Sequence, residues 1–450
     1  MRCARLITHL GSMATMLLAA TAGAHADLFA YLAKPEPKFD WKQINEQTVP
    51  EGRITEFAFT SQTWRGIDWS HQLRVYTPAQ LKHPKLMLLF ITGGSTDSQV
   101  KPQHHAEAFA LAKACGGRVA TLPQVPNQPL LGGKKEDDLI GETFVNFMNS
   151  QEPDWPLLLP MVKSAIKAMD TLQEWGRERR EPVEGFVVTG ASKRGWTTWL
   201  TAAADPRVKA IAPMVIPTLN MKAQTIHQKK SWGFFSEQIE DYTRRGLTEK
   251  FDDPVGKKLW LMVDPFTYLD RIKVPILQIN GTNDRYWTLD SMNLYWDDIK
   301  APKYVVYLPN AGHGLEKQRE WAVNGIGALF RSVATGQALP SSTVSHSFSE
   351  TDSLPRIVIN HPDPKPKNAT LWSAQSPTLD FREAQWNPAE TRKWTGTELS
   401  FVAPKPLANP WMALFVEQTY EIEGLEYHLT TPIWLVDKAE IPKGESEKAP

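Results

Sequence analysis

The stretch from Phe186 to Trp196 constrains the fold of this chain more than any other. A run of β-branched and aromatic residues, typical of a buried strand, ends at Gly190, and a helix-forming segment begins beside Gly195. Ser192 stands between the two glycines, which permit the positive φ and close backbone contacts of a tight turn. The pattern therefore predicts a strand, a sharp turn with a serine at its apex, and a helix whose N-terminus points at that serine.

The same arrangement is the nucleophile elbow of the α/β-hydrolase enzymes, in which the apex serine attacks the substrate. The usual motif is G-x-S-x-G, whereas here the second glycine falls one residue late, at Gly195. A serine that only caps the following helix is the alternative interpretation. The choice between the two depends on whether the rest of the chain provides a base and an acid.

Two further strand ends provide these partners in the order that the hydrolase fold requires. An apolar run before residue 281 is followed by Asp284, and another before residue 309 is followed by His313. An imidazole removes the serine proton, and a carboxylate orients the imidazole. We therefore predict Ser192 as the nucleophile, His313 as the base and Asp284 as the acid. Asp290, near the start of the next expected helix, is the alternative acid.

An oxyanion hole needs two backbone N–H donors, one of them from the residue after the nucleophile. Lys193 supplies the first donor. The loop after the strand expected at 86–91 supplies Gly94 as the preferred second donor and Gly93 as the next candidate. Glycines that only form the turn are the alternative interpretation.

The side chains around the serine suggest how a substrate is held. The cations of Lys193 and Arg194 oppose the helix dipole, so they either pair with acidic neighbours or bind an anionic substrate group or the oxyanion. Trp196, Tyr286 and Trp287 are candidates for an aromatic substrate pocket, with core packing as the alternative.

Strand and helix patterns alternate over most of the chain, which predicts an α/β fold with a hairpin feeding a parallel sheet. The expected strands lie at 54–60, 69–76, 86–91, 118–122, 185–189, 210–216, 275–279 and 304–308, and the expected helices at 105–114, 155–176, 196–204, 232–242, 289–299 and 317–335. Residues 35–50 are polar and are expected to be irregular. The interval 217–269 has no strand pattern and is predicted to be a helical cap over the active site.

The hydrolase domain is expected at 27–338, and the two ends of the chain have sequence patterns that differ from it. Residues 1–26 combine Arg2 and Arg5, an apolar run and an Ala24-His25-Ala26 cleavage site, which predicts a signal peptide and export to a periplasm or the medium. Short alternating runs predict a small all-β sandwich at 339–441, followed by a disordered tail at 442–450.

Three runs, at 189–199, 280–287 and 308–314, make the chain resemble the family of PhoPQ-activated pathogenicity-related proteins. The resemblance extends over nearly the whole mature chain, including the β-rich end at 411–417. It implies an exported α/β-hydrolase domain with a C-terminal β-sandwich, and it puts Ser192, Asp284 and His313 where the family's triad belongs. The chain is similar, more distantly, to the glucuronoyl esterases, which have Arg after the nucleophile where this chain has Lys193.

These observations predict a serine hydrolase that acts on a carboxylic ester or a peptide-like amide, with no cofactor and no metal. The balance of 50 basic and 50 acidic residues argues against a nucleic-acid partner, and no segment after the signal peptide is long and apolar enough to span a membrane. An aminopeptidase or dipeptidyl-peptidase is one alternative, with Glu237, Glu240 and Asp241 as candidates for holding the substrate ammonium. A non-catalytic binding or signalling protein on a hydrolase scaffold is the other.

Overall fold

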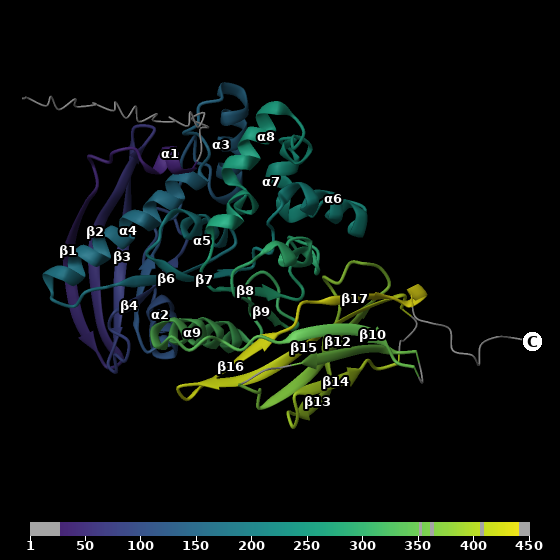
Figure 1. The fold of residues 1–450 in the computed structure, drawn as a ribbon. Helices are drawn as coiled ribbons and strands as arrows, with labels where there is room; N and C mark the ends of the chain where they lie inside the picture. The colour runs from purple at the N-terminus through teal and green to yellow at the C-terminus, as the bar shows by residue number, and fades with distance from the viewer. Residues whose placement is uncertain (1–27, 351–352, 361–363, 406–408, 441–450) are drawn as a thin grey trace, which may run out of the picture.

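The computed structural model describes residues 28–350, 353–360, 364–405 and 409–440 (Figure 1). The predicted signal peptide and the predicted disordered tail lie outside these ranges. Within them, the strands form a sheet of 14 strands and a second sheet of three strands.

The large sheet begins with three long antiparallel strands, β1 (Asp40–Val49), β2 (Gly52–Trp64) and β3 (Ile67–Pro78). The hairpin of β2 and β3 confirms the expected one. The expectation of an irregular segment at 35–50 was wrong, because β1 occupies most of it. β1 is an edge strand with mostly exposed side chains, so it has no apolar alternation that would reveal it in the sequence.

The centre of the sheet is parallel and confirms the six expected strands. These are β5 (Arg118–Leu122), β4 (Leu86–Ile91), β6 (Gly185–Ala191), β7 (Val208–Met214), β8 (Ile276–Gly281) and β9 (Lys303–Leu308), in that spatial order. The chain runs from β4 outward to β5 and then crosses back to β6. A reversal of this kind opens a crevice at the carboxyl ends of β4 and β6, which is where α/β sheets bind ligands. The order and directions are those of the α/β-hydrolase fold.

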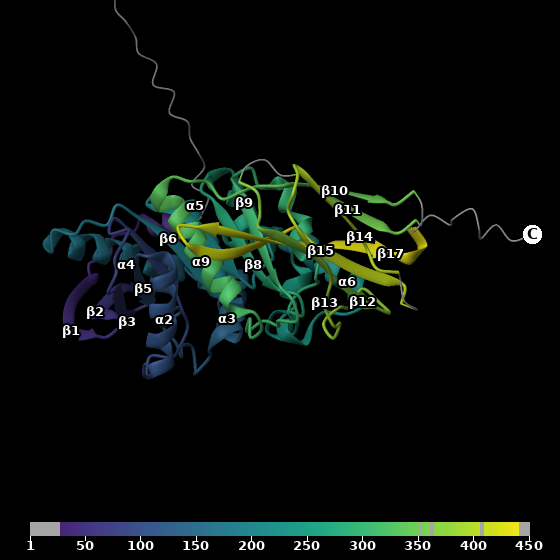
Figure 2. The ribbon, with the colours of Figure 1, turned by 90° about the horizontal axis from the view of Figure 1, so that it is seen from below.

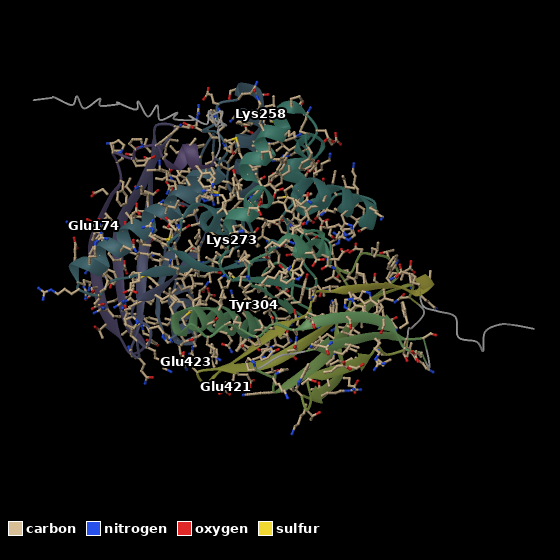
Figure 3. The ribbon with its side chains drawn as sticks, in the orientation of Figure 1. Glu174, Lys258, Lys273, Tyr304, Glu421 and Glu423 are labelled. Carbon is tan, nitrogen blue, oxygen red and sulfur yellow. The ribbon has the colours of Figure 1, made fainter. Side chains whose placement is uncertain are left out.

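Helices cover both faces of this sheet (Figures 1 and 2). On one face lie α2 (Pro102–Cys115) and α9 (Arg319–Thr335), and on the other lie α4 (Leu158–Glu178) and α5 (Lys193–Ala204). α3 (Glu136–Ser150) packs mainly against the helical segment between β7 and β8. Successive residues of a strand point to opposite faces, so Val187 joins the core under α2 and α9 while Val188 joins the core under α4 and α5. Figure 3 shows the side chains that fill these layers.

Two of the expected helices were wrong. Residues 289–299 form two short 3₁₀ turns, Ser291–Leu294 and Trp296–Asp298. Met292, Tyr295 and Ile299 are buried at intervals of three and four residues, a spacing that successive turns present as well as a helix does. The expected helix at 232–242 is broken at Gly233, whose φ of 83° ends the preceding helix.

The segment between β7 and β8 contains helices and no strand among its residues, all of which the structure describes. Its elements are α6 (Met221–Trp232), α7 (Glu240–Thr243), α8 (Pro254–Val263) and the 3₁₀ turns Glu237–Ile239, Leu247–Glu249 and Pro265–Arg271. α6, α7 and α8 lie together above the carboxyl ends of the parallel strands (Figure 1). We refer to this segment as the cap.

The C-terminal strands form two layers. The smaller sheet has β10 (Thr343–Phe348), β11 (Pro355–Asn360) and β14 (Glu398–Val402); the larger layer has β12 (Asn368–Ser376), β13 (Asn387–Lys393), β15 (Trp411–Ile422), β16 (Leu425–Thr430) and β17 (Trp434–Asp437). Ile357 and Phe401 of the smaller sheet share a core with Leu371 and Leu414 of the larger layer. This is the face-to-face packing of a sandwich.

The larger layer is continuous with the central sheet, which the sequence does not indicate. Thr430 of β16 pairs with Val305 of β9, and the Thr430 hydroxyl accepts a hydrogen bond from the backbone N–H of Tyr307 at 3.2 Å. Tyr304, labelled in Figure 3, adds a bond from its hydroxyl to the carbonyl of Leu339 at 2.9 Å. The C-terminal β region is thus joined to the strand that precedes His313.

Candidate active site

Ser192 occupies a strained backbone conformation at the end of β6. Its φ is 58° and its ψ is −126°, a combination that L-residues rarely adopt, and its N–H donates to the carbonyl of Met214 at 2.9 Å. The glycine at position 195, one residue later than in the usual motif, is required for a steric reason. A Cβ on Gly195 would lie 2.9 Å from the Gly190 carbonyl oxygen and 3.1 Å from that of Met214, so the first turn of α5 packs directly on two strands.

The structure brings Asp284 and His313 together. His313 Nδ1 lies 2.8 Å from Asp284 Oδ2, and the backbone N–H of Tyr286 donates to the other carboxylate oxygen at 2.8 Å. Asp284 is buried, with 8% of its surface exposed. The alternative acid is engaged elsewhere, because Asp290 Oδ1 lies 2.8 Å from His227 Nε2.

Tyr286 lies beside His313 and lines the same cavity as Ser192. Its ring stacks on the imidazole of His313 with 4.0 Å between the ring centres, and it also lines the cavity beside Ser192. Burial, followed by the negative charges of Asp137 and Asp284, raises the pKa of Tyr286 to about 12. The hydroxyl therefore stays protonated at neutral pH and is available as a hydrogen-bond donor.

Ser192 opens onto a narrow cavity beneath the cap, with a volume of about 50 Å³. Its wall is mainly aromatic and aliphatic. The lining residues are Asp137, Lys193, Trp196, Ile216, Met221, Thr225, Ile239, Tyr242, Thr248, Phe251, Trp260, Tyr286 and Trp287. The three aromatic residues singled out from the sequence are all among them. Trp196 also has a packing role, since its indole N–H donates to the carbonyl of Val263 at 2.5 Å.

The candidate oxyanion donors follow the ends of two neighbouring strands, β6 and β4. Lys193 is the first residue of α5, where a backbone N–H has no carbonyl of its own helix to bond. Gly93 and Gly94 follow β4, which pairs with β6. A Cβ on Gly93 would lie 2.5 Å from Arg194 Nη2, so this glycine makes room for the guanidinium. Gly94 has a φ of 106°, a backbone conformation that residues with a side chain rarely adopt, so glycine is favoured there as well.

The side chains of Lys193 and Arg194 are engaged with carboxylates at the start of α3. Arg194 holds Glu136 through two bonds of 2.6 and 2.7 Å and donates to the Val125 carbonyl at 2.6 Å. Lys193 Nζ lies 3.0 Å from carboxylate oxygens of both Glu136 and Asp137. Two cations thus face two carboxylates, which offsets the unfavourable interaction of the cations with the dipole of α5.

The electrostatics of Glu136 reflect this pairing. Burial alone would raise the pKa of its carboxyl, but the hydrogen bonds and charge of Arg194, together with the charge of Lys193, hold the pKa well below its usual range. Glu136 is therefore ionised throughout the range in which a neutral-pH hydrolase works.

The sequence interpretation missed α3 and with it Glu136 and Asp137. Tyr242 of the cap donates to Asp137 Oδ1 at 2.8 Å, so this helix also supports the cap. A signal for α3 exists, since three consecutive acidic residues, Glu136 to Asp138, precede an apolar run, as expected at a helix N-terminus.

A larger hollow lies on the α2 and α9 face and has a volume of about 1480 Å³. Ala191 and His313 border it, whereas Ser192 does not. His313 therefore borders the wide hollow, and Tyr286, which stacks on His313, lines the narrow cavity under the cap.

Comparison with known proteins agrees with this architecture. The family model of PhoPQ-activated pathogenicity-related proteins matches residues 28–382. The chain belongs to this family. It is also 31% identical over 423 residues to autocrine proliferation repressor protein A of Dictyostelium discoideum, an alignment that covers 87% of this chain and 85% of that protein. The family model extends through β12 into the C-terminal β region.

Solved structures of esterases resemble the chain more weakly. Acetyl xylan esterase 1 from a Thermoanaerobacterium species is 18% identical, with a TM-score of 0.46 and coverage of 67% of this chain and 92% of that one. A glucuronoyl esterase from Solibacter usitatus is 13% identical, with a TM-score of 0.42 and coverage of 69% and 92%. TM-scores of 0.46 and 0.42 are too low to support an assignment, so the fold is assigned from the order and directions of the strands described above.

Outside the site, three features also bear on function: the length of the helices, the placement of metal-ligating residue types, and the cysteine. In the part of the chain that the structure describes, no helix is long and apolar enough to cross a membrane, and no three His, Cys, Asp or Glu residues lie together as metal ligands would. Cys115 is fully buried, and burial raises the pKa of its thiol, which makes it an unreactive packing residue.

Proposed function

We propose that this protein is a serine hydrolase that transfers an acyl group from a carboxylic ester to water through Ser192, His313 and Asp284. The observation that carries the proposal is the 2.8 Å bond between His313 and Asp284 at the sheet edge where Ser192 stands in a strained turn. Strain of this kind persists only where the surrounding structure fixes it, and it is concentrated at functional sites.

These positions support the following reaction. His313 Nδ1–H donates to Asp284, which leaves Nε2 free to take the proton of the Ser192 hydroxyl as its oxygen attacks the ester carbon. The backbone N–H groups of Lys193 and Gly94 stabilise the oxyanion. His313 then gives the proton to the departing alkoxide, and a water molecule releases the acyl group from Ser192 by the same steps.

The surroundings of Ser192 favour a neutral, apolar acyl group. The cavity wall is aromatic and aliphatic, and the nearby cations of Lys193 and Arg194 are already paired with Glu136 and Asp137. We place the acyl group in this cavity, and we place the leaving group on the side of the wide hollow that His313 borders.

The peptidase alternative has less support. An aminopeptidase or dipeptidyl-peptidase requires free carboxylates for the substrate ammonium. Of the three cap candidates, Glu237 pairs with Arg382 at 3.1 Å and Asp241 pairs with Arg244 at 2.7 Å, whereas Glu240 is exposed to solvent. We retain export as a further proposal, on the basis of the sequence pattern of residues 1–26.

A panel of p-nitrophenyl esters tests the proposed function. The panel contains acetate, butyrate and octanoate as neutral acyl groups and the hemisuccinate as an anionic one. We expect turnover of the neutral esters, a rate at least about tenfold lower for the hemisuccinate, and loss of turnover in Ser192→Ala by about a thousandfold or more. Equal rates for wild type and Ser192→Ala would contradict the proposal and favour a binding or signalling role. Preferential cleavage of aminoacyl p-nitroanilides over all esters would favour the peptidase alternative.

A further inference from the structure

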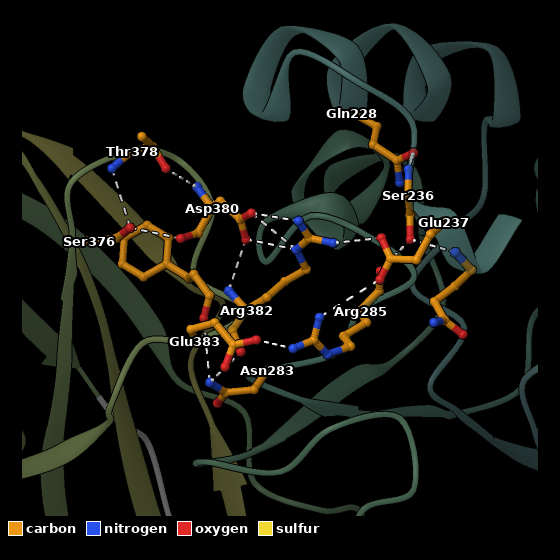
Figure 4. Close-up of polar contacts among 12 residues, drawn as sticks. Gln228, Ser236, Glu237, Asn283, Arg285, Ser376, Thr378, Asp380, Arg382 and Glu383 are labelled. Carbon is orange, nitrogen blue, oxygen red and sulfur yellow. Dashed lines mark hydrogen bonds and ion pairs between the residues drawn. The ribbon is translucent and has the colours of Figure 1, made fainter. Parts of the chain in front are cut away.

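The C-terminal β region reaches the proposed active site through one loop. Residues 377–386, between β12 and β13, form what we call the 377–386 loop, and Figure 4 shows its contacts with the cap and with the segment around Asp284. The loop lies more than 60 residues beyond His313 in sequence. Its contacts are directed at three places: the residue before the acid, the residue three before the base, and the cap.

The first contact is with Asn283, the residue that precedes Asp284. Its side-chain NH₂ donates to the carbonyls of Ala384 at 2.7 Å and Arg382 at 3.1 Å. Its backbone N–H donates to the Ala311 carbonyl at 2.9 Å, two residues before His313. Asn283 therefore ties the acid loop to the base loop and to the 377–386 loop at once.

The second contact is with Asn310, three residues before His313. Its side-chain NH₂ donates to the carbonyl of Trp386 at 2.9 Å, and its side-chain oxygen accepts from the N–H of Trp386 at 2.8 Å. Trp386 is almost completely buried and packs against Phe415 of β15. The base loop is thus anchored on the C-terminal sheet through a pair of bonds that resembles a strand pairing.

The third contact is with the cap. Arg382, held by Asp380, has its Nη1 3.1 Å from Oε2 of Glu237 (Figure 4). It also stacks on Trp232, with its guanidinium carbon 4.4 Å from the ring centre. Glu383 pairs with Arg285, next to the acid. The cap is bonded to the same segment from its own side, since Ser236 donates to the Arg285 carbonyl at 2.6 Å and Gln228 to that of Tyr286 at 2.8 Å.

We propose that the 377–386 loop is a positioning element of the active site. Its bonds to Asn283 and Asn310 fix the distance between Asp284 and His313, and its residue Arg382 holds the cap over Ser192. The proposal rests on the proposed function for its effect on catalysis. It assigns the C-terminal β region a role in the reaction that acts through the segments carrying Asp284 and His313.

The positioning arm is tested with Asn283→Ala and Asn310→Gly; the glycine retains the φ of 60° that Asn310 adopts. The matched control is Asn293→Ala, which also removes a bond to a carbonyl of the C-terminal region, that of Ile433 at 2.9 Å. Asn293 belongs to the 3₁₀ turn Ser291–Leu294, and Ile433 lies outside the 377–386 loop. With p-nitrophenyl acetate, we expect both test variants to lower kcat at least tenfold while KM changes less than threefold. We expect the control to stay within twofold of wild type.

A second readout separates this proposal from the proposed function. The proton that His313 Nδ1 shares with Asp284 gives a downfield ¹H NMR signal, which Asp284→Asn identifies by removing it. We expect Asn283→Ala and Asn310→Gly to shift or broaden this signal and Asn293→Ala to leave it unchanged, whether or not the ester is turned over. An unchanged signal and an unchanged kcat in folded test variants would overturn the proposal. An inactive wild type with a perturbed signal in the test variants would overturn the proposed function alone.

The cap arm is tested by hydrogen–deuterium exchange with Arg382→Gln. Its matched control is Arg392→Gln, because Arg392 likewise pairs with a carboxylate, Glu390, and stacks on an aromatic ring, that of Phe401, but belongs to β13. We expect at least tenfold faster exchange in α6 and α7 for Arg382→Gln and no change there for Arg392→Gln. Equal exchange in wild type and Arg382→Gln would show that the loop does not hold the cap.

Discussion

The substitution Arg194→Gln distinguishes a structural role of the cations beside Ser192 from a role in substrate binding. Arg194 is buried, with 8% of its surface exposed, and makes three hydrogen bonds to Glu136 and Val125. Breaking a fully buried ion pair costs about 3–5 kcal/mol. Glu136 is 41% exposed on its side chain and keeps Lys193 as a partner, so solvent and the remaining cation reduce the cost. We expect a loss of about 2–3 kcal/mol in the free energy of unfolding.

Urea denaturation measures this loss as a lower midpoint at an unchanged m value. Because the guanidinium acts through Glu136, Val125 and the space beside Gly93, we also expect the rates for neutral and anionic esters to fall by the same factor. Arg207→Gln is the control, since Arg207 pairs with Asp205 at 2.6 Å in another part of the fold and should lose stability without losing turnover. An Arg194→Gln variant as stable as wild type, with a selective loss for the hemisuccinate, would refute this reasoning and assign Arg194 to the substrate.

Three further predictions concern single side chains. Asp284→Asn should lower kcat by about 10⁴-fold, whereas Asp290→Asn should change it less than twofold; the reverse ranking would move the acid role to Asp290. Ser192→Gly should be about 1 kcal/mol more stable to urea than Ser192→Ala, because glycine adopts the φ of 58° without strain, and equal stabilities would mean that the turn is not strained. His71 is buried, and this lowers its pKa to about 4, so its neutral form is favoured by folding. The contribution of His71 to the free energy of unfolding should be fully present above about pH 6.5 and should fall by up to about 3 kcal/mol as the pH drops to about 4. A His71→Gln variant that loses as much stability to urea between pH 7 and pH 4.5 as the wild type would show that another group is responsible.

The parallel part of the fold could be predicted because its strands are buried on both faces. Such strands appear as short continuous apolar runs, and the residue that follows each run lies at the carboxyl edge of the sheet. For this reason Ser192, Asp284 and His313 were predicted as a group from three separate strand ends. The bond between Asp284 and His313 is consistent with that grouping.

The remaining features depend on contacts that leave little trace in a local pattern. β1 is polar because it is an exposed edge strand, and the pairing of Thr430 with Val305 joins residues 125 positions apart. The partner of Arg194 could not be identified without α3, because Glu136 lies 58 residues away. The contacts of Asn283 and Asn310 are made with backbone carbonyls of the 377–386 loop, and an acceptor carbonyl has no sequence signature.

The central claim, that Ser192 is an activated nucleophile, is tested most directly by covalent labelling. A fluorophosphonate probe reacts with a serine whose proton is taken by a neighbouring base as the oxygen attacks phosphorus and fluoride leaves. Digestion followed by mass spectrometry locates the adduct. We predict one adduct per protein, on Ser192, with labelling abolished in Ser192→Ala and slowed at least tenfold in Asp284→Asn. Labelling at another residue, or equal labelling of wild type and Ser192→Ala, would contradict the account.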